Sequence, residues 1–176
     1  MTQPSPLTIG STPGYSPTIG HVVGILTYAR STTLAAVAGL SMAQLDHLQD
    51  AASNSIGALL AHIAAVEQSY QILTFEDRLP SPDENVRLAA ALALGAEGRR
   101  TLRGQPLDHY LDELAIVRRR TLELLASRDD EWLNAAVRVA PRINAHWAWF
   151  HVAEDEVSHR GQIRWLRPRL PKDADT

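Results

Sequence analysis

Apolar residues recur every three or four positions along four long stretches of the chain, near residues 17–38, 55–75, 106–127 and 144–167. This period is typical of helices that bury one face and expose the other. A helix start signal, Ser16-Pro17, precedes the first of these stretches, and no segment with the two-residue period of a strand competes with them. The pattern predicts an all-α protein, a four-helix bundle with crossing connections.

Segments rich in proline, glycine and charge flank and join the four stretches. We expect residues 16–170 to form the bundle domain, between an irregular N-terminal arm at 1–15 and a C-terminal tail at 171–176. The apolar side chains of the arm would lie on the surface of the bundle: Leu7, Ile9 and Tyr15.

Shorter features are expected between the long stretches. Residues 41–46 have the spacing of a capping box and predict one helical turn. Two prolines indicate a surface crossing over residues 76–85. Residues 128–142 predict a linker with a short extended piece. Residues 86–105 predict a short helix and then a flexible loop that carries Arg99, Arg100 and Arg103.

Two ionisable residues interrupt the apolar stripe of the last stretch, which consists of Ala148, Val152, Asp155, His159, Ile163 and Leu166. Asp155 and His159 are four residues apart, which separates them by one turn, about 6 Å along the helix axis. Burial without a partner would cost each of them roughly 1–3 kcal/mol. They either hydrogen-bond to each other or to another helix, or they bind a divalent metal together with a third ligand.

His62 is the candidate for the third ligand, because it lies on the inward side of the second stretch. A single histidine on an apolar face is more often hydrogen-bonded in the core, but here a facing helix supplies two more ligand-type residues. Glu67 is offset from the same stripe and is expected at its flank or behind the ligands. His151 lies on the side of Asp155 and His159, but about 12 Å from His159 along the axis. We therefore expect it to line the pocket or to support the ligands from behind.

Three further predictions concern single positions. The run Arg118-Arg119-Arg120 spans more than half a helical turn, so most of it is expected to face solvent. Arg160 lies off the inward stripe and is expected at the surface or at an interface. Gly161 is expected to permit the close approach of another helix.

The composition of the chain excludes several kinds of partner and of metal ligand. The 176 residues carry a net charge of −3 and give no reason to expect nucleic acid or an anionic membrane surface as a partner. The absence of cysteine leaves His, Asp and Glu as metal ligands and excludes a cysteine nucleophile. No apolar run approaches the ~20 residues of a membrane span, and the N-terminus lacks the pattern of a signal peptide. We expect a soluble cytoplasmic protein.

Three motifs give the chain a family resemblance. They are Leu-Leu-Ala-His-Ile at 59–63 with Glu67 after it, residues 117–125 followed by Asp-Asp-Glu-Trp-Leu at 129–133, and Trp-Phe-His-Val-Ala-Glu-Asp-Glu-Val-Ser-His-Arg-Gly-Gln-Ile at 149–163. With these motifs, of which the third is the most specific, the chain resembles the DinB-like superfamily of metalloenzymes and the related uncharacterised and thiol S-transferase branches. The name of that superfamily refers to damage-inducible expression and does not imply contact with DNA.

The resemblance implies a metal site. In this superfamily the usual ligands are one histidine on the second helix and a His-x-x-x-His pair on the fourth. Carried over, these positions are His62, Asp155 and His159, with aspartate where the first histidine of the pair is usual. Aspartate also binds divalent metals, so two histidines and one carboxylate would leave positions open to water or substrate. Zinc or nickel is expected first, with manganese or iron as alternatives; a metal-free hydrogen-bonded site is the other interpretation.

Two classes of function follow. In the first, the chain is an enzyme, a thiol S-transferase or a hydrolase, in which a metal activates water or a low-molecular-weight thiol for reaction with a small molecule. Proton transfer then belongs to one of four candidates, among which the sequence does not choose: His151, Tyr28, Glu67 and Tyr70. In the second, the bundle is a non-catalytic stress-response protein that binds a metal or a small molecule.

The resemblance also implies a homodimer formed through helix faces. Trp147 and Trp165 lie off the inward stripe of the last stretch. Large aromatic side chains in that position favour a surface that a second copy covers.

Overall fold

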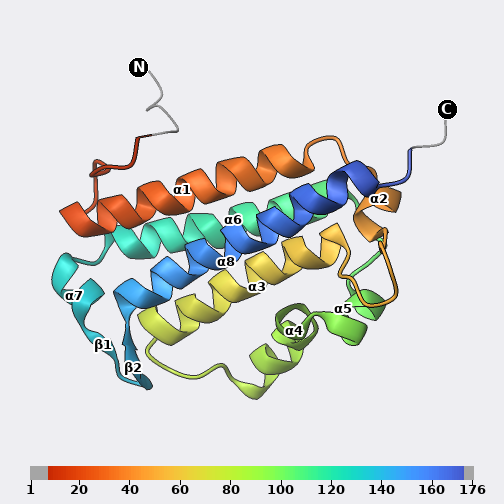
Figure 1. Cartoon of the computed structure of the whole chain (residues 1–176). Coiled ribbons are helices and arrows are strands. Elements are labelled where there is room, and N and C mark those ends of the chain that lie inside the picture. The colour runs from red at the N-terminus through yellow and green to blue at the C-terminus, as the bar shows by residue number, and fades with distance from the viewer. Residues whose placement is uncertain (1–7, 173–176) are drawn as a thin grey trace.

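The computed structural model describes residues 8–172, and within them the chain has eight helices and one two-stranded antiparallel sheet. Four of the helices are long: α1 (Pro17–Val37), α3 (Ile56–Phe75), α6 (Leu107–Ala126) and α8 (Ala145–Leu166). They lie side by side as a bundle (Figure 1). The all-α fold class and the four predicted helical stretches are therefore confirmed.

Local capping explains where two of the long helices begin. The Ser55 hydroxyl accepts a hydrogen bond from the backbone N–H of Ala58 at the start of α3. The Asn144 side chain accepts one from the backbone N–H of Trp147 at the start of α8. Each cap satisfies a backbone donor that the first turn of a helix leaves without an internal partner.

The start of α1 is capped by a distant residue instead. Ser16 precedes Pro17 as expected, but the Ser16 hydroxyl donates to Asp130 Oδ1, at 2.5 Å, and makes no cap hydrogen bond. The Asp130 carboxylate accepts the backbone N–H groups of Thr18 and Ile19, at 3.1 Å each. A carboxylate more than a hundred residues further along the chain therefore holds the N-terminus of α1, where negative charge is favourable.

Short helices, some predicted and some not, occupy much of the chain between the long ones. α2 (Met42–Asp46) is the predicted helical turn, with both hydrogen bonds of a capping box. α4 (Pro82–Ala93) begins inside the predicted surface crossing, because proline is well placed in the first turn of a helix. α5 (Gly95–Thr101) contains Arg99 and Arg100, so the prediction of a flexible basic loop there is wrong.

The segment between α6 and α8 is also more regular than a linker. It contains α7 (Asp130–Asn134) and the hairpin of β1 (Ala136–Val137) and β2 (Ala140–Asn144). The expected short extended piece is confirmed, whereas α7 was missed. After α8, a short 3₁₀ helix (Arg167–Arg169) leads to the C-terminal end of the described chain.

The described part of the N-terminal arm, residues 8–15, is irregular apart from one turn. Thr12 donates its hydroxyl to the carbonyl of Gly20, and the Tyr15 hydroxyl donates to the carbonyl of Leu122. A Cβ on Gly20 would lie 2.5 Å from the backbone nitrogen of Thr12, so glycine is needed at this approach. The expected surface contact of Leu7 lies outside the described residues.

The long helices pack in a fixed order around the bundle. α1 packs along α8, α8 along α3, and α3 along α6, whereas α1 and α6 make few contacts. α4 packs against α3. Two apolar clusters fill the interior, one toward the end that carries α2 and one toward the end that carries α7 (Figure 1). Within the described residues, no helix combines the length and apolarity needed to cross a membrane.

A layer of four charged side chains separates the two clusters, and each long helix contributes one of them: Arg30, Glu67, Arg118 and Glu156. Arg30 pairs with Glu156 at 2.8 Å and with Glu67 at 2.9 Å. Arg118 pairs with Glu67 at 2.7 Å and with Glu156 at 3.0 Å. The layer is thus electrically neutral and joins all four helices.

This layer corrects one prediction and refines another. Glu67 is fully buried rather than at the flank of its stripe. Most of the run at 118–120 faces solvent as predicted, since Arg119 and Arg120 are exposed, but Arg118 is buried. The burial of Arg118 follows from its position along α6. It shares one face of the helix with other buried residues at helical spacing, namely Leu114, Thr121 and Leu125.

Another correction concerns Gly161 on α8. No heavy atom lies within 4 Å of the position that its Cβ would occupy. The prediction that this glycine permits close approach of another helix is therefore wrong.

Candidate metal centre

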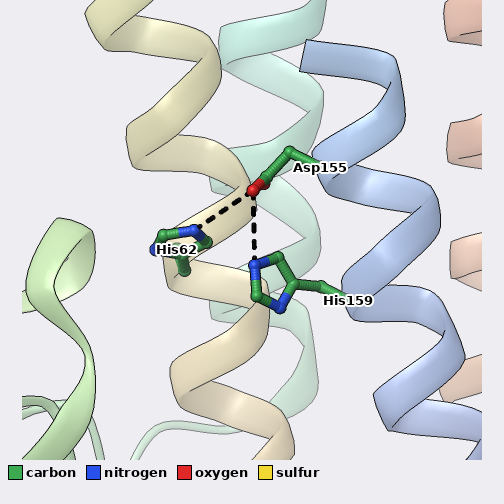
Figure 2. A group of neighbouring side chains, drawn as sticks. All are labelled: His62, Asp155 and His159. Atoms are coloured by element: carbon green, nitrogen blue, oxygen red, sulfur yellow. Dashed lines mark ion pairs between the residues drawn. The ribbon is translucent and has the colours of Figure 1, made fainter. Parts of the chain in front are cut away.

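The three predicted ligands come together between α3 and α8. His62 projects from α3, and Asp155 and His159 project from α8 one turn apart (Figure 2). The two helices are antiparallel, since His62 meets His159 while Tyr70, two turns further along α3, meets His151, two turns back along α8. This arrangement places the three side chains at the same level of the bundle.

The separations within the triad suit one shared ion. Asp155 Oδ1 lies 3.5 Å from His62 Nε2 and 3.3 Å from His159 Nε2 (Figure 2). One ligand atom from each residue lies within 4.8 Å of the others. Two ligands that each lie about 2 Å from one ion are about 3–4 Å apart. The three residues can therefore approach a divalent ion without a change of backbone.

The hydrogen bond on the far side of His62 decides which nitrogen faces the triad. His62 Nδ1 lies 2.8 Å from the backbone carbonyl of Ala91 on α4. A carbonyl can only accept, so Nδ1 carries the proton and donates it, as is usual for metal-binding histidines. In a neutral ring Nε2 then presents a lone pair to the Asp155 carboxylate, which is unfavourable unless a cation or a proton lies between them.

A second observation also favours a cation between His62 and Asp155. Asp155 Oδ2 is buried, and no hydrogen-bond partner for it is present among the described residues. A buried carboxylate oxygen without a partner is unfavourable. The residues present therefore fit a divalent cation, which would satisfy this oxygen and the lone pair of His62 together. The alternative, a protonated His62 beside Asp155, satisfies the lone pair only.

The electrostatics of the triad support an ionised Asp155. Burial alone would raise the pKa of Asp155, but hydrogen bonds and charge from His159 and His62 hold it well below its usual range. Burial alone would lower the pKa of His62, but its bonds with Asp155 and Ala91 raise it above the usual value. The site therefore keeps negative charge on Asp155 and attracts positive charge to its neighbours.

His159 is held by Gln162, one turn further along α8. Gln162 Nε2 lies 3.2 Å from His159 Nδ1. A side chain three residues after a helical histidine is within reach of it, so this contact could be found in the sequence. The carbonyl of Ala91 has no comparable signature, because any residue at that position would present it.

Two of the four proton-transfer candidates lie beside the triad. The rings of Tyr70 and His151 are 5.7 Å apart, and His151 stacks on Trp147 at 5.0 Å. Burial, and to a lesser extent the charge of Asp155, raise the pKa of Tyr70. His151 does not belong to the group of ligand atoms, as its distance along the helix predicted.

The other two candidates lie elsewhere. Glu67 accepts hydrogen bonds from Arg30, Arg118 and Thr121 in the buried charged layer. Tyr28 belongs to α1, where the guanidinium of Arg160 lies 5.9 Å from its ring centroid. His151 and Tyr70 are therefore the two candidates near the triad.

Comparison with known proteins now adds to this geometry. No curated protein matches the chain. The model of the mycothiol S-transferase family matches residues 21–171, a range that contains the triad, both neighbouring aromatic residues and the buried charged layer. The match confirms the resemblance to the DinB-like superfamily and its thiol S-transferase branch. The chain belongs to the mycothiol S-transferase family.

Proposed function

We propose that the protein is a metal-dependent S-transferase, which transfers a low-molecular-weight thiol, mycothiol in the first instance, to a small-molecule electrophile in the cytoplasm. The observation that carries the proposal is the triad of His62, Asp155 and His159, whose ligand atoms lie within 4.8 Å of one another and include a buried carboxylate oxygen and an imidazole lone pair that one divalent cation would satisfy together. The family match supports a thiol rather than water as the group that is activated.

Two histidines and one carboxylate would hold the ion and leave further coordination positions open. A divalent ion bound there supplies positive charge that favours a thiolate over a thiol at neutral pH. The donor set suits zinc or nickel, with manganese or iron as alternatives.

Tyr70 and His151, which lie next to the triad, have different roles in the proposed reaction. A tyrosine hydroxyl with an ordinary pKa of about 10 is protonated at neutral pH, and the pKa of Tyr70 is raised above that value. Tyr70 can therefore donate a hydrogen bond to an anionic sulfur. The His151 imidazole lies against Tyr70, and imidazole is the side chain best suited to exchange protons near neutral pH. We therefore assign the removal of the thiol proton to His151 and the orientation of the sulfur to Tyr70.

The proposal is tested by metal content and by a thiol-dependent spectrum. Purified protein should take up one equivalent of zinc or nickel by elemental analysis, and mycothiol should give the nickel form a sulfur-to-nickel absorption band. His159→Ala should abolish uptake, because two remaining ligands do not hold the ion. His151→Ala, the matched control on the same helix, should weaken uptake by less, since His151 lies outside the ligand group.

Asp155→His extends this test, because it recreates the usual pair of histidines at four-residue spacing. We expect it to retain the metal, whereas Asp155→Ala should lower metal affinity at least as much as the roughly 10–100-fold loss typical of residues that only support a ligand. If the protein takes up none of zinc, nickel, manganese and iron, the triad is a buried hydrogen-bond network that fixes helix packing. Metal uptake with hydrolysis but without a thiol-dependent band would identify a hydrolase.

A further inference from the structure

A recess lies beside the triad, between the C-terminal half of α8 and the loop that precedes α3. Its volume is about 510 Å³, within the roughly 300–1,000 Å³ typical of small-molecule sites. Its lining is mostly apolar and comes from two segments, namely Ala52, Ser53 and Asn54 of the loop, and Ser158, Gly161, Gln162, Trp165 and Leu166 of α8.

The recess and the triad share one wall. Gln162 lines the recess, and its Nε2 lies 3.2 Å from His159 Nδ1. A molecule in the recess therefore lies one side chain away from a metal ligand. This position suits the part of a substrate that does not react but that places a reacting atom at the triad.

Both walls of the recess make contacts with neighbouring residues. The Arg169 guanidinium lies 3.9 Å from the centroid of the Trp165 ring, and Arg169 also donates to the Trp165 carbonyl. On the opposite side, Arg99 donates to the carbonyl of Ala52, and Asn54 Oδ1 accepts the backbone N–H of Gly95. The indole of Trp165 is in contact with Arg169, lines the recess and is 53% exposed, so it offers a flat surface on which an aromatic ring can stack.

Gly161 lines the recess, and no neighbouring atom is close enough to require a glycine at this position. It lies inside α8, where glycine is a poor helix former. Its Cβ position has no heavy atom within 4 Å, and it is not among the glycines with a positive φ. The absence of a side chain therefore serves neither a close helix contact nor a special backbone conformation, and it leaves this side of the recess open.

We propose that the recess binds the aromatic ring of the electrophilic co-substrate, and that Gly161 sets the size of the ring it accepts. This inference rests on the proposed S-transfer. For a halogenated nitroaromatic, the sulfur of the thiolate forms a bond to the ring carbon that carries the halogen. The carbon–halogen bond breaks and the halide leaves with its electron pair, while the proton of the thiol has passed to a base. No oxidant or reductant is needed.

Binding is tested with 2,4-dinitrotoluene, which has the ring but no leaving group. Added to the full-length ¹⁵N-labelled protein, it should shift the backbone amide signals of Gly161 and Gln162 and the indole signal of Trp165. Gly161→Leu should weaken this binding by roughly tenfold or more, because the leucine side chain occupies the space of the ring. Arg164→Leu places the same side chain on the exposed surface of the same helix and should leave binding within twofold.

Turnover provides a second measurement with two electrophiles and the same thiol. Gly161→Leu should lower kcat/KM for 1-chloro-2,4-dinitrobenzene by roughly tenfold or more, and it should leave kcat/KM for the small electrophile iodoacetamide within twofold. The variant should fold, because leucine enters open space and is a better helix former than glycine. Unchanged zinc affinity would show that His159 is undisturbed.

The outcomes separate this inference from the proposed function. Nitroaromatic shifts that fall on other residues, or equal binding by Gly161→Leu and Arg164→Leu, would overturn the recess while metal and thiol uptake still support S-transfer. Conversely, a protein that binds neither metal nor thiol would refute S-transfer, and with it the role of the recess as a co-substrate site, even if Gly161 and Trp165 signals shift.

Discussion

Arg118 carries its charge into the interior of the bundle, where Glu67 and Glu156 neutralise it. Its remaining donor reaches the backbone carbonyl of Leu26 at 2.5 Å, so the guanidinium has partners on several sides. Burial alone would lower the pKa of Arg118, but the two carboxylates raise it above its usual value. The charge is therefore stable inside the protein only as long as both carboxylates are present.

Arg118→Ala should destabilise the protein by about 3–5 kcal/mol, because it leaves carboxylate charge buried without a full set of partners. Arg119→Ala, at the exposed neighbouring position, should change the free energy of unfolding by no more than about 0.5 kcal/mol. Urea unfolding followed by circular dichroism measures both. Equal effects of the two substitutions would contradict the importance of the buried layer.

At the level of elements, the N-terminus of α1 depends on α7. Asp130 accepts hydrogen bonds from Ser16, Thr18 and Ile19, and none of these contacts is local in sequence. The bond from the Ser16 hydroxyl and the backbone donors of α1 lower the pKa of Asp130 to about 2. The connection between α6 and α8 therefore also fixes the first turn of α1.

This contact should make stability depend on pH in the acid range. An aspartate in an unfolded chain titrates near ~3.9, so the native state binds fewer protons at this group than the unfolded state between the two values. The contribution of Asp130 is then complete above about pH 4 and disappears as the pH falls toward 2. Asp130→Asn should lower the urea midpoint at pH 6, and the difference from the wild type should shrink at pH 3.

The control is Asp112→Asn, on the exposed face of α6. It removes one carboxylate at a position without a role in capping, and its urea midpoint should follow that of the wild type at both pH values. A difference between wild type and Asp130→Asn that is independent of pH would show that the charge of Asp130 is not what holds α1.

At the scale of the whole molecule, the outer surface of α8 exposes large apolar side chains. Trp147, Phe150 and Val157 are 45%, 52% and 38% exposed. Exposed apolar surface of this kind favours contact with another protein surface. Trp165 is exposed as well, but it stacks with Arg169 and lines the recess, so we place the contact toward the N-terminal half of α8.

We expect a homodimer through this surface, with a mass near twice 19.3 kDa by light scattering at micromolar concentration. Phe150→Glu should convert it to a monomer, because a charge would be buried in an apolar contact. Ile116→Glu, at an equally exposed position on α6, should leave the mass unchanged. A monomeric wild type would refute the prediction.

The sequence by itself determined the four long helices and the inward position of the triad. Helical period and caps act over a few residues, so the stretch from Asn144 to Leu166 could be assigned without knowledge of its neighbours. Asp155 and His159 stood out for the same reason, since each interrupts an apolar stripe. The prediction that Asp155 and His159 lie close to His62 did not follow from local sequence. It rested on the expected four-helix bundle and on the family resemblance.

Only the tertiary structure decided which charged residues are buried together and which glycine faces open space. Arg30, Glu67, Arg118 and Glu156 stabilise one another because four helices bring them to one level. A charged side chain on a helix is buried or exposed according to the residue opposite it on the neighbouring helix. The local periodicity of a sequence shows neither which helix is the neighbour nor which residues lie at the same level of the bundle. The same holds for the capping of α1 by Asp130 and for the open position at Gly161, because both depend on segments that are distant in sequence.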